Sequence, residues 1–279
     1  MKKIFFEVNN NLNLPIKFDL RRNNYNHKSP LNIVIHGFKA FRNWGFIPYL
    51  CDKLAENCGP TINLDFSLNG IENEEKMLYN PDLYRINTVS QQLEDINILL
   101  DYIKSDEFLY NIEDVWNGEI NLIGHSLGGA VSIVTAGERD DISRIVLWGT
   151  ISKTDRNTER QKKEWRETGY IEFKESHSGQ VLYLNVEYLN DKELNKDRID
   201  LRRIISELEI PICIIHGKLD FTVRLNEAEI LENLSKKSSK LESLYIEKSN
   251  HTFGVSHPFT KTNDNLELAI EKTIDFVKI

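Results

Sequence analysis

The chain has 279 residues, 40% of them hydrophobic, which is enough to bury the core of one α/β domain of ordinary size. Its formal net charge is -8, and lysine and arginine are interleaved with aspartate and glutamate, so a nucleic-acid surface is not expected. The three cysteines have neither the even count of a disulfide framework nor the spacing of a zinc site, and buried free thiols in a cytoplasmic protein are expected instead.

The first half of the chain predicts a hairpin followed by alternating strands and helices. Two β-like runs, 3–8 and 14–20, flank an asparagine-rich turn, as in an antiparallel hairpin. The elements expected next are a strand at 31–35, a helix at 46–57, a strand at 61–66, a helix at 88–104, and strands at 119–123 and 142–148. This alternation predicts the α/β class, with a mostly parallel sheet covered by helices on both faces.

The alternation breaks between Thr150 and Leu208. A charged stretch at 153–168 has helical potential, and two β-like runs flank Ser176–Gly179 like a small hairpin. The sheet pattern then resumes with a strand at 210–215, a helix at 226–234, a strand at 241–246 and a closing helix at 265–277. We therefore expect a single domain over 1–279 with a cap or lid insertion at about 150–208.

A serine motif stands in the middle of the chain. Gly124–Gly128 (GHSLG) lies between an apolar run at 120–123 and a helical stretch of small residues at 129–134. The pattern G-x-S-x-G predicts a sharp turn that exposes a serine hydroxyl at the end of a parallel strand, on strained backbone. A side chain at either glycine would collide with the neighbouring strand and helix. Alone, the motif also fits a glycine-rich turn into a buried helix.

Two further residues complete a catalytic hypothesis. A serine hydroxyl is a weak nucleophile at neutral pH, so Ser126 needs a general base and a group that orients the base. Binding sites of open α/β sheets lie at the carboxyl ends of the strands. Asp220 follows the strand at 212–215, and His251 follows the strand at 241–246. Nucleophile, orienting acid and general base are therefore expected to meet at one edge of the sheet.

The same chemistry requires backbone N–H donors that bind the oxyanion of the tetrahedral intermediate. Leu127, the residue after the nucleophile, is expected to supply one N–H. The loop His36–Phe38, which follows an earlier strand, suits the second, with Phe38 as the expected donor and Gly37 letting the backbone come close.

With these residues in order, the chain resembles the α/β-hydrolase superfamily over nearly its whole length. The resemblance rests on four motifs: His36–Phe38, Gly124–Gly128, His216–Asp220 and Asn250–Gly254. Within the superfamily the chain is similar to small bacterial esterases and serine-aminopeptidase-like hydrolases, which include cinnamoyl and feruloyl esterases. The resemblance implies a Ser126, Asp220, His251 triad, hydrolysis of a small carboxylic ester through an acyl-enzyme, and no cofactor. The segment Asp65–Gly70 departs from the family's glycine-rich turn, which leaves the shape of the acyl pocket open.

The same residues allow several alternative interpretations. Asp220 could instead cap the helical turn that follows it, because aspartate is a favoured cap residue. His251 could be a surface loop histidine. A peptidase or thioesterase would use the same triad, and a non-catalytic binding protein could keep the fold.

The remaining expectations concern the pocket and the partners. Trp148 and Trp165 are candidate walls of the substrate pocket, with ordinary packing as the alternative. No histidine pair has the spacing of a helical metal site, and the turn at 124–129 lacks the features of a nucleotide-binding loop, so no metal or cofactor is expected. The expected partner is a small ester. A nucleic-acid partner is not expected because of the acidic, interleaved charges, and a membrane partner is not expected because the first apolar run already ends at Glu7. The oligomeric state stays open.

Overall fold

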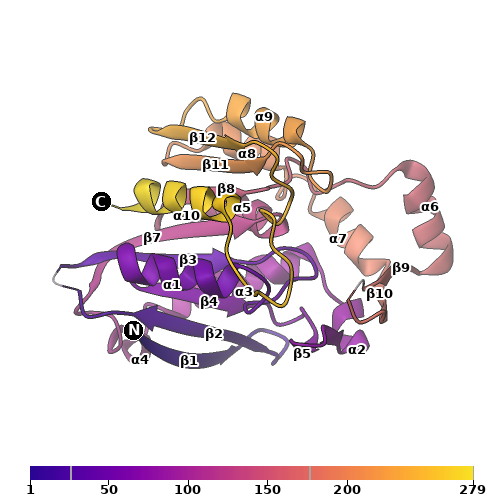
Figure 1. Ribbon diagram of the computed structural model, residues 1–279. Coiled ribbons are helices and arrows are strands. Elements are labelled where there is room, and N and C mark those ends of the chain that lie inside the picture. Colours follow the sequence, from indigo (N-terminus) through magenta and orange to yellow (C-terminus); the bar gives the residue numbers. More distant parts are fainter. Residues whose placement is uncertain (26, 176, 279) are drawn as a thin grey trace.

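The structure is a computed structural model that describes residues 1–25, 27–175 and 177–278. Its centre is an eight-stranded sheet (Figure 1). The strands, from one edge of the sheet to the other, are β1 (Lys2–Asn9), β2 (Pro15–Arg22), β4 (Thr61–Asp65), β3 (Ser29–Ile35), β7 (Trp116–His125), β8 (Ile142–Trp148), β11 (Ile212–Gly217) and β12 (Leu241–Ile246). The β1–β2 hairpin is antiparallel, and β2 also runs antiparallel to β4. All other neighbours in this sheet are parallel, so the expected α/β class is confirmed.

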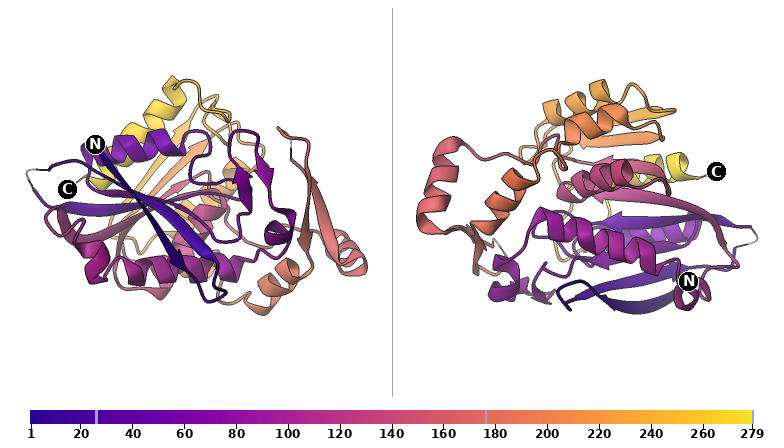
Figure 2. Two further views of the ribbon diagram at one scale, coloured as in Figure 1. Left: turned by 90° about the horizontal axis from the view of Figure 1, so that it is seen from below. Right: turned by 180° about the vertical axis from the view of Figure 1, so that it is seen from behind.

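Both faces of the sheet are covered by helices, because successive side chains of the buried strands point to opposite faces. Ile33 of β3 packs in a cluster with α3 (Val89–Tyr102), α5 (Leu127–Glu138), α8 (Leu201–Glu207) and α9 (Leu225–Leu234). The next residue, Val34, belongs to the cluster that contains α1 (Ile47–Asn57) and α10 (Asp264–Val277). Helices α1 and α10 lie in front of the sheet in Figure 1, and α3 and α5 cover the other face, seen in the right-hand view of Figure 2.

A group of elements between β8 and β11 stands away from the sheet, at the right of Figure 1. It consists of α6 (Glu159–Thr168), β9 (Tyr170–Lys174), β10 (Val181–Asn185) and α7 (Glu187–Leu194), and β9 and β10 form the expected antiparallel hairpin. Ser176, in the expected turn of this hairpin, lies outside the described residues. Helix α8 follows but packs against α5, so the part that projects ends at α7. That the whole chain is one domain with a cap remains a prediction.

The projecting hairpin is fastened to a segment of short elements that sequence periodicity does not predict. These are β5 (Ile71–Asn73), β6 (Leu78–Tyr79) and α2 (Pro81–Arg85), while α4 (Asp106–Leu109) follows α3. The amide of Gln180 donates to the carbonyl oxygen of Tyr79 at 2.7 Å and accepts from its N–H at 2.8 Å. This pair of hydrogen bonds joins the hairpin to β6 as a strand would.

Two further expectations can be compared with the structure. Cys51, Cys58 and Cys213 are buried and unpaired, as expected. Within the described ranges, none of the helices combines the length and the apolar character that crossing a membrane requires.

Candidate active site

Ser126 occupies the turn between β7 and α5. Its backbone has φ 56° and ψ −115°, a conformation that side-chain-bearing residues rarely adopt. The N–H of Ser126 donates to the carbonyl oxygen of Trp148 at 2.8 Å, which ties the turn to the end of β8. The serine is therefore held at the carboxyl edge of the parallel strands, as the motif predicts.

The flanking glycines are required by close backbone contacts. A Cβ on Gly124 would lie 2.4 Å from the carbonyl oxygen of Gly128, and a Cβ on Gly128 would lie 2.2 Å from that of Ile35. A Cβ on Gly37 would approach the Cβ of Ser126 to 3.0 Å. The steric reason inferred from the sequence is therefore present at both glycines of the motif.

Asp220 and His251 are joined by a hydrogen bond. His251 Nδ1 lies 2.6 Å from Oδ2 of Asp220, whose side chain is buried. The other carboxylate oxygen accepts the backbone N–H groups of Thr222 and Val223 at 2.9 and 2.8 Å. Burial opposes ionisation of Asp220, but the hydrogen bonds to His251 and Val223 and the charge of His251 outweigh it and lower the pKa of the carboxyl. Asp220 therefore has two roles at once: it caps its own turn, and it is the hydrogen-bond partner of His251.

A second histidine supports the loop that carries His251. Nε2 of His125 donates to the carbonyl oxygen of His251 at 3.0 Å, and the two rings lie 4.7 Å apart. Burial, together with the nearby His251, lowers the pKa of His125 to about 3, so the ring is neutral at physiological pH. His216 makes the corresponding contact on the acid loop, where its Nε2 donates to Val223 O at 2.8 Å.

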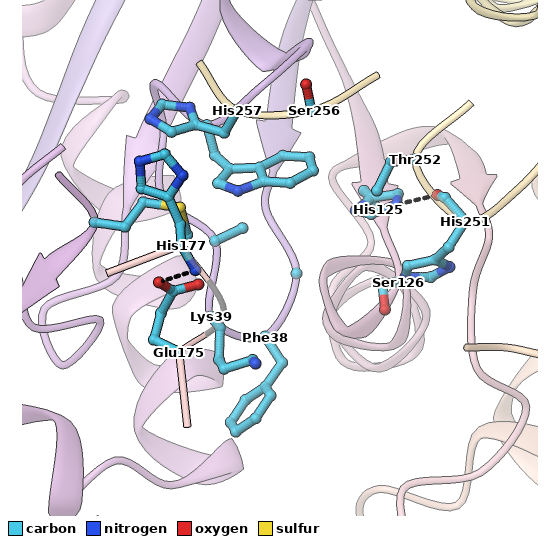
Figure 3. A pocket seen from close by; sticks show the side chains of 14 residues that line it. Phe38, Lys39, His125, Ser126, Glu175, His177, His251, Thr252, Ser256 and His257 are labelled. Atoms are coloured by element: carbon cyan, nitrogen blue, oxygen red, sulfur yellow. Dashed lines mark hydrogen bonds between the residues drawn. The ribbon is translucent and has the colours of Figure 1, made fainter. Parts of the chain in front are cut away.

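Ser126 and His251 face one cavity of about 440 Å³ (Figure 3). The residues lining it are Gly37, Phe38, Lys39, Ala40, Trp44, Met77, His125, Ser126, Glu175, His177, His251, Thr252, Ser256 and His257. A cavity of this size suits a small organic molecule.

Two backbone N–H groups next to Ser126 have no acceptor within the described part of the chain. They belong to Phe38, in the loop after β3, and to Leu127, the first residue of α5. The first N–H groups of a helix have no partner inside the helix. Both expected donors to an oxyanion are therefore available, and Phe38 itself lines the cavity.

Comparison with known proteins identifies the fold. No protein-family model and no curated protein matches the sequence. Solved structures match over nearly the whole chain. Est1E from Butyrivibrio proteoclasticus with ferulic acid bound has a TM-score of 0.70 and 20% identity, covering 97% of each chain. Alpha/beta hydrolase domain-containing protein 10 from mouse has a TM-score of 0.70 and 17% identity, covering 98% of this chain and 97% of that one. The chain has the α/β-hydrolase fold.

A third structure agrees with this assignment. The Pyrococcus furiosus esterase PF2001 has a TM-score of 0.64 and 13% identity, covering 99% of this chain and 90% of that one. At such identities the comparison establishes the α/β-hydrolase fold, while the chemistry has to be argued from the residues of this chain.

The two tryptophans suggested as pocket walls lie elsewhere in this α/β-hydrolase fold. Trp148 is 1% exposed, stacks on Phe46 and donates from Nε1 to Thr273 Oγ1, beneath α10. Trp165 is 3% exposed and donates from Nε1 to the carbonyl oxygen of Leu184. Neither is among the residues that line the cavity at Ser126. The alternative, ordinary packing, describes both, because an indole buried on all sides has no face left for a ligand.

The cavity at Ser126 is instead lined mostly by residues of loops. His257 accepts from the N–H of Gly45 at 3.1 Å, donates to the carbonyl oxygen of Glu74 at 2.8 Å, and stacks beside Trp44. Glu175, the residue after β9, accepts the N–H of His177 at 2.7 Å (Figure 3). The sequence places His177 and His257 only in loops, because hydrophobic periodicity carries no information on the path of a loop.

No group of three or more histidine, cysteine, aspartate or glutamate side chains within residues 1–25, 27–175 and 177–278 is arranged to hold a metal ion.

Proposed function

We propose that this protein is a serine hydrolase that cleaves a small carboxylic ester through an acyl-enzyme. The observation that carries the proposal is the 2.6 Å hydrogen bond between Asp220 and His251 at the cavity that also contains Ser126 on its strained turn. A nucleophile, a base and a group that orients the base are the parts that nucleophilic catalysis by serine requires.

In the proposed reaction, His251 accepts the proton of the Ser126 hydroxyl from its Nε2 side while Nδ1 stays hydrogen-bonded to Asp220. The serine oxygen attacks the ester carbonyl, and the N–H groups of Phe38 and Leu127 bind the oxyanion that forms. His251 then gives the proton to the leaving alcohol. Water attacks the acyl-enzyme in the same way, with His251 as base, and releases the acid.

Two further observations support an ester of modest size. The cavity volume of about 440 Å³ is near the lower end of the range for small-molecule sites. Est1E, which shares the fold, was solved with ferulic acid bound, and its name and that of the Pyrococcus furiosus protein mark both as esterases. We also expect the protein to act in the cytoplasm, since Cys51, Cys58 and Cys213 are unpaired.

The test is hydrolysis of short p-nitrophenyl esters by Ser126→Ala. Turnover should fall to background, because alanine has no hydroxyl with which to form the proposed acyl-enzyme. Ser256→Ala is the matched control: Ser256 is an exposed serine that lines the same cavity, and its loss should leave turnover within about threefold of wild type. Undiminished turnover by Ser126→Ala would disprove the proposal.

A substrate panel separates the related activities. Ester, thioester and aminoacyl-anilide analogues with the same acyl group are compared by kcat/KM, and we expect the ester to be preferred. A fluorophosphonate probe should label wild type at Ser126, and a folded wild-type protein that resists labelling would indicate a non-catalytic binding protein on this fold.

A further inference from the structure

A second cavity lies in the projecting part of the molecule. Its lining residues come from α6, α7, the segment that leads into α8 and the segment before α6; the helices are labelled in Figure 1. Its volume is about 460 Å³, and it shares no lining residue with the cavity at Ser126. Buried apolar side chains form part of its wall: Leu189, Ile199 and Leu201. The charged residues around it are mostly lysines: Lys153, Lys162, Lys192 and Lys196.

Lys192 is the unusual residue of this cavity, because it is 6% exposed and has no carboxylate partner. Its ammonium donates to Asn157 Oδ1 at 3.1 Å and lies over the rings of Tyr188 and Trp165, at 5.2 and 5.9 Å from their centroids. In the described part of the chain, no carboxylate oxygen comes within 4.0 Å of Lys192 Nζ. Burial lowers the pKa of this lysine. The charges of Asp155, Glu193 and Asp191 act against burial, but none of these carboxylates is in direct contact with the ammonium. A buried ammonium whose direct contacts are all neutral is costly, so a counter-charge in contact with it would stabilise it.

The carboxylates around this cavity are already engaged. Asp155 pairs with Lys162 at 2.5 Å, and Glu193 pairs with Arg166 at 2.5 Å. Asp200 caps α8 by accepting the N–H of Arg203 at 3.2 Å. Neither Lys153 nor Lys196 forms an ion pair with any residue that the structure describes. Among the described residues that line the cavity, three lysines (Lys153, Lys192 and Lys196) and one carboxylate (Asp200) therefore have no ion-pair partner, so the excess charge is positive although the chain as a whole is acidic.

We propose that this cavity binds a small organic anion, a carboxylate on an apolar body, with Lys192 as the buried counter-charge. The carboxylate replaces the missing partner of Lys192, and the exposed Lys153 and Lys196 draw the anion to the opening. The apolar body of the ligand packs on Leu189, Ile199 and Leu201. A ligand that carries charge alone would leave this apolar wall uncovered, which favours an organic anion over an inorganic one.

The test is calorimetric titration of the full-length protein with hexanoate, its neutral isostere hexanamide and inorganic phosphate. Hexanoate should bind saturably, at least tenfold more tightly than either of the others. The variant Lys192→Met keeps the aliphatic stem over the two rings and removes the charge, so it should weaken hexanoate binding at least tenfold. Lys163→Met is the matched control, because Lys163 is an exposed lysine of α6 that pairs with Glu167 outside the cavity.

Each outcome of these measurements either supports or refutes an anion site at Lys192. Absence of saturable hexanoate binding, phosphate binding as tight as hexanoate, or unchanged affinity in Lys192→Met would each overturn the proposal. Should Lys192→Met fail to fold, the side-chain resonances of ¹³C-lysine-labelled wild type decide, with Lys192→Arg used to assign the signal. A hexanoate-dependent shift of the Lys192 resonance supports the site, and an unmoved resonance refutes it. Hexanoate is also the kind of acid that the proposed hydrolysis releases, but its binding at the Ser126 cavity would not respond to Lys192→Met, because the two cavities share no lining residue. The effect of Lys192→Met therefore separates this site from the proposed activity.

Discussion

Asp220 holds His251 with one carboxylate oxygen and its own loop with the other. Oδ2 lies 2.6 Å from His251 Nδ1, while Oδ1 accepts the N–H groups of Thr222 and Val223 at 2.9 and 2.8 Å. The loop hydrogen bonds fix the position of the carboxylate before any substrate arrives. The direction of the imidazole is therefore determined by the backbone that follows β11, and one side chain couples the fold to the proposed chemistry.

This double role makes Asp220→Asn an informative variant. The amide oxygen of asparagine can still accept from the loop, but its NH₂ group then faces His251 Nδ1, which must accept rather than donate. The imidazole proton moves to Nε2, where the proton of Ser126 has to be received. We expect kcat for a p-nitrophenyl ester to fall by about 10³- to 10⁴-fold, with a nearly unchanged melting temperature.

Asp200→Asn is the control for Asp220→Asn, since Asp200 caps backbone N–H at α8 but faces no histidine among the described residues. Its hydrolysis rate should match wild type. An Asp220→Asn variant that stays within tenfold of the wild-type rate would remove Asp220 from the mechanism.

His125 should act as a positioning residue for His251. His125→Leu removes the donor to the carbonyl oxygen of His251 and leaves that oxygen without its partner, at a cost of about 1–3 kcal/mol. We expect kcat to fall roughly tenfold to a hundredfold, because the base is displaced, and KM to change less, because His125 is one of 14 residues that line the cavity. His125→Gln retains an N–H donor and should recover most of the loss. Equal activities of the two variants would contradict the role of this hydrogen bond.

The succession of strands and helices along the chain, and the edge of the sheet where Ser126, Asp220 and His251 lie, follow from the sequence because both depend on local patterns. The order of the strands within the sheet was not predicted, because it depends on pairing between distant segments. Apolar runs predicted β3, β7, β8 and β11, and the residues that follow them reach the same edge wherever neighbouring strands are parallel. The position of Ser126 was also predictable, since the flanking glycines report the backbone contacts that the turn requires.

The cavity wall was not predictable in this way. Trp148 and Trp165 are the residues that the sequence suggests for a pocket, because both are large, Trp148 ends a strand and Trp165 lies in the insertion that could cover the site. Their indole N–H groups instead donate to Thr273 and Leu184, which lie 125 and 19 positions away along the chain. Residues such as His177 reach the cavity through the fastening of the hairpin to Tyr79, a contact between loops with no periodic signature.

The motif glycine Gly128 should be irreplaceable even by alanine. Its Cβ would lie 2.2 Å from the carbonyl oxygen of Ile35 and 2.6 Å from that of His36, so β3 or α5 would have to move. We expect Gly128→Ala to lower the free energy of unfolding by about 3 kcal/mol and to reduce ester hydrolysis, because the same shift displaces Ser126. Urea denaturation and kcat/KM measure the two effects.

Gly169→Ala provides the comparison for Gly128→Ala. Gly169 has φ 80°, and a Cβ there would meet no atom of the described residues within 4 Å beyond its own chain neighbours, so alanine meets backbone strain alone. That strain costs about 1–2 kcal/mol and should leave hydrolysis unchanged. A Gly128→Ala variant no less stable than Gly169→Ala would show that the close contacts can relax.

Buried His36 should make the protein less stable in mild acid. Burial lowers the pKa of His36 to about 4, although its Nδ1 donates to the carbonyl oxygen of Gly37 at 2.9 Å. The unfolded chain binds a proton at the ordinary histidine pKa of about 6.5, so its protonation favours unfolding as the pH falls from about 6.5 towards 4. From pH 8 to pH 5 this single group should lower the free energy of unfolding by about 2 kcal/mol.

His36→Gln removes this titration, so the difference in unfolding free energy between pH 8 and pH 5, measured by urea denaturation, should shrink by about 2 kcal/mol relative to wild type. Comparing the two pH values within each protein cancels any loss of stability that the substitution causes at both. Part of the pH dependence should persist, because burial also lowers the pKa values of His125 and His216. An identical pH dependence in His36→Gln and wild type would mean that His36 is protonated equally in the folded and unfolded chains.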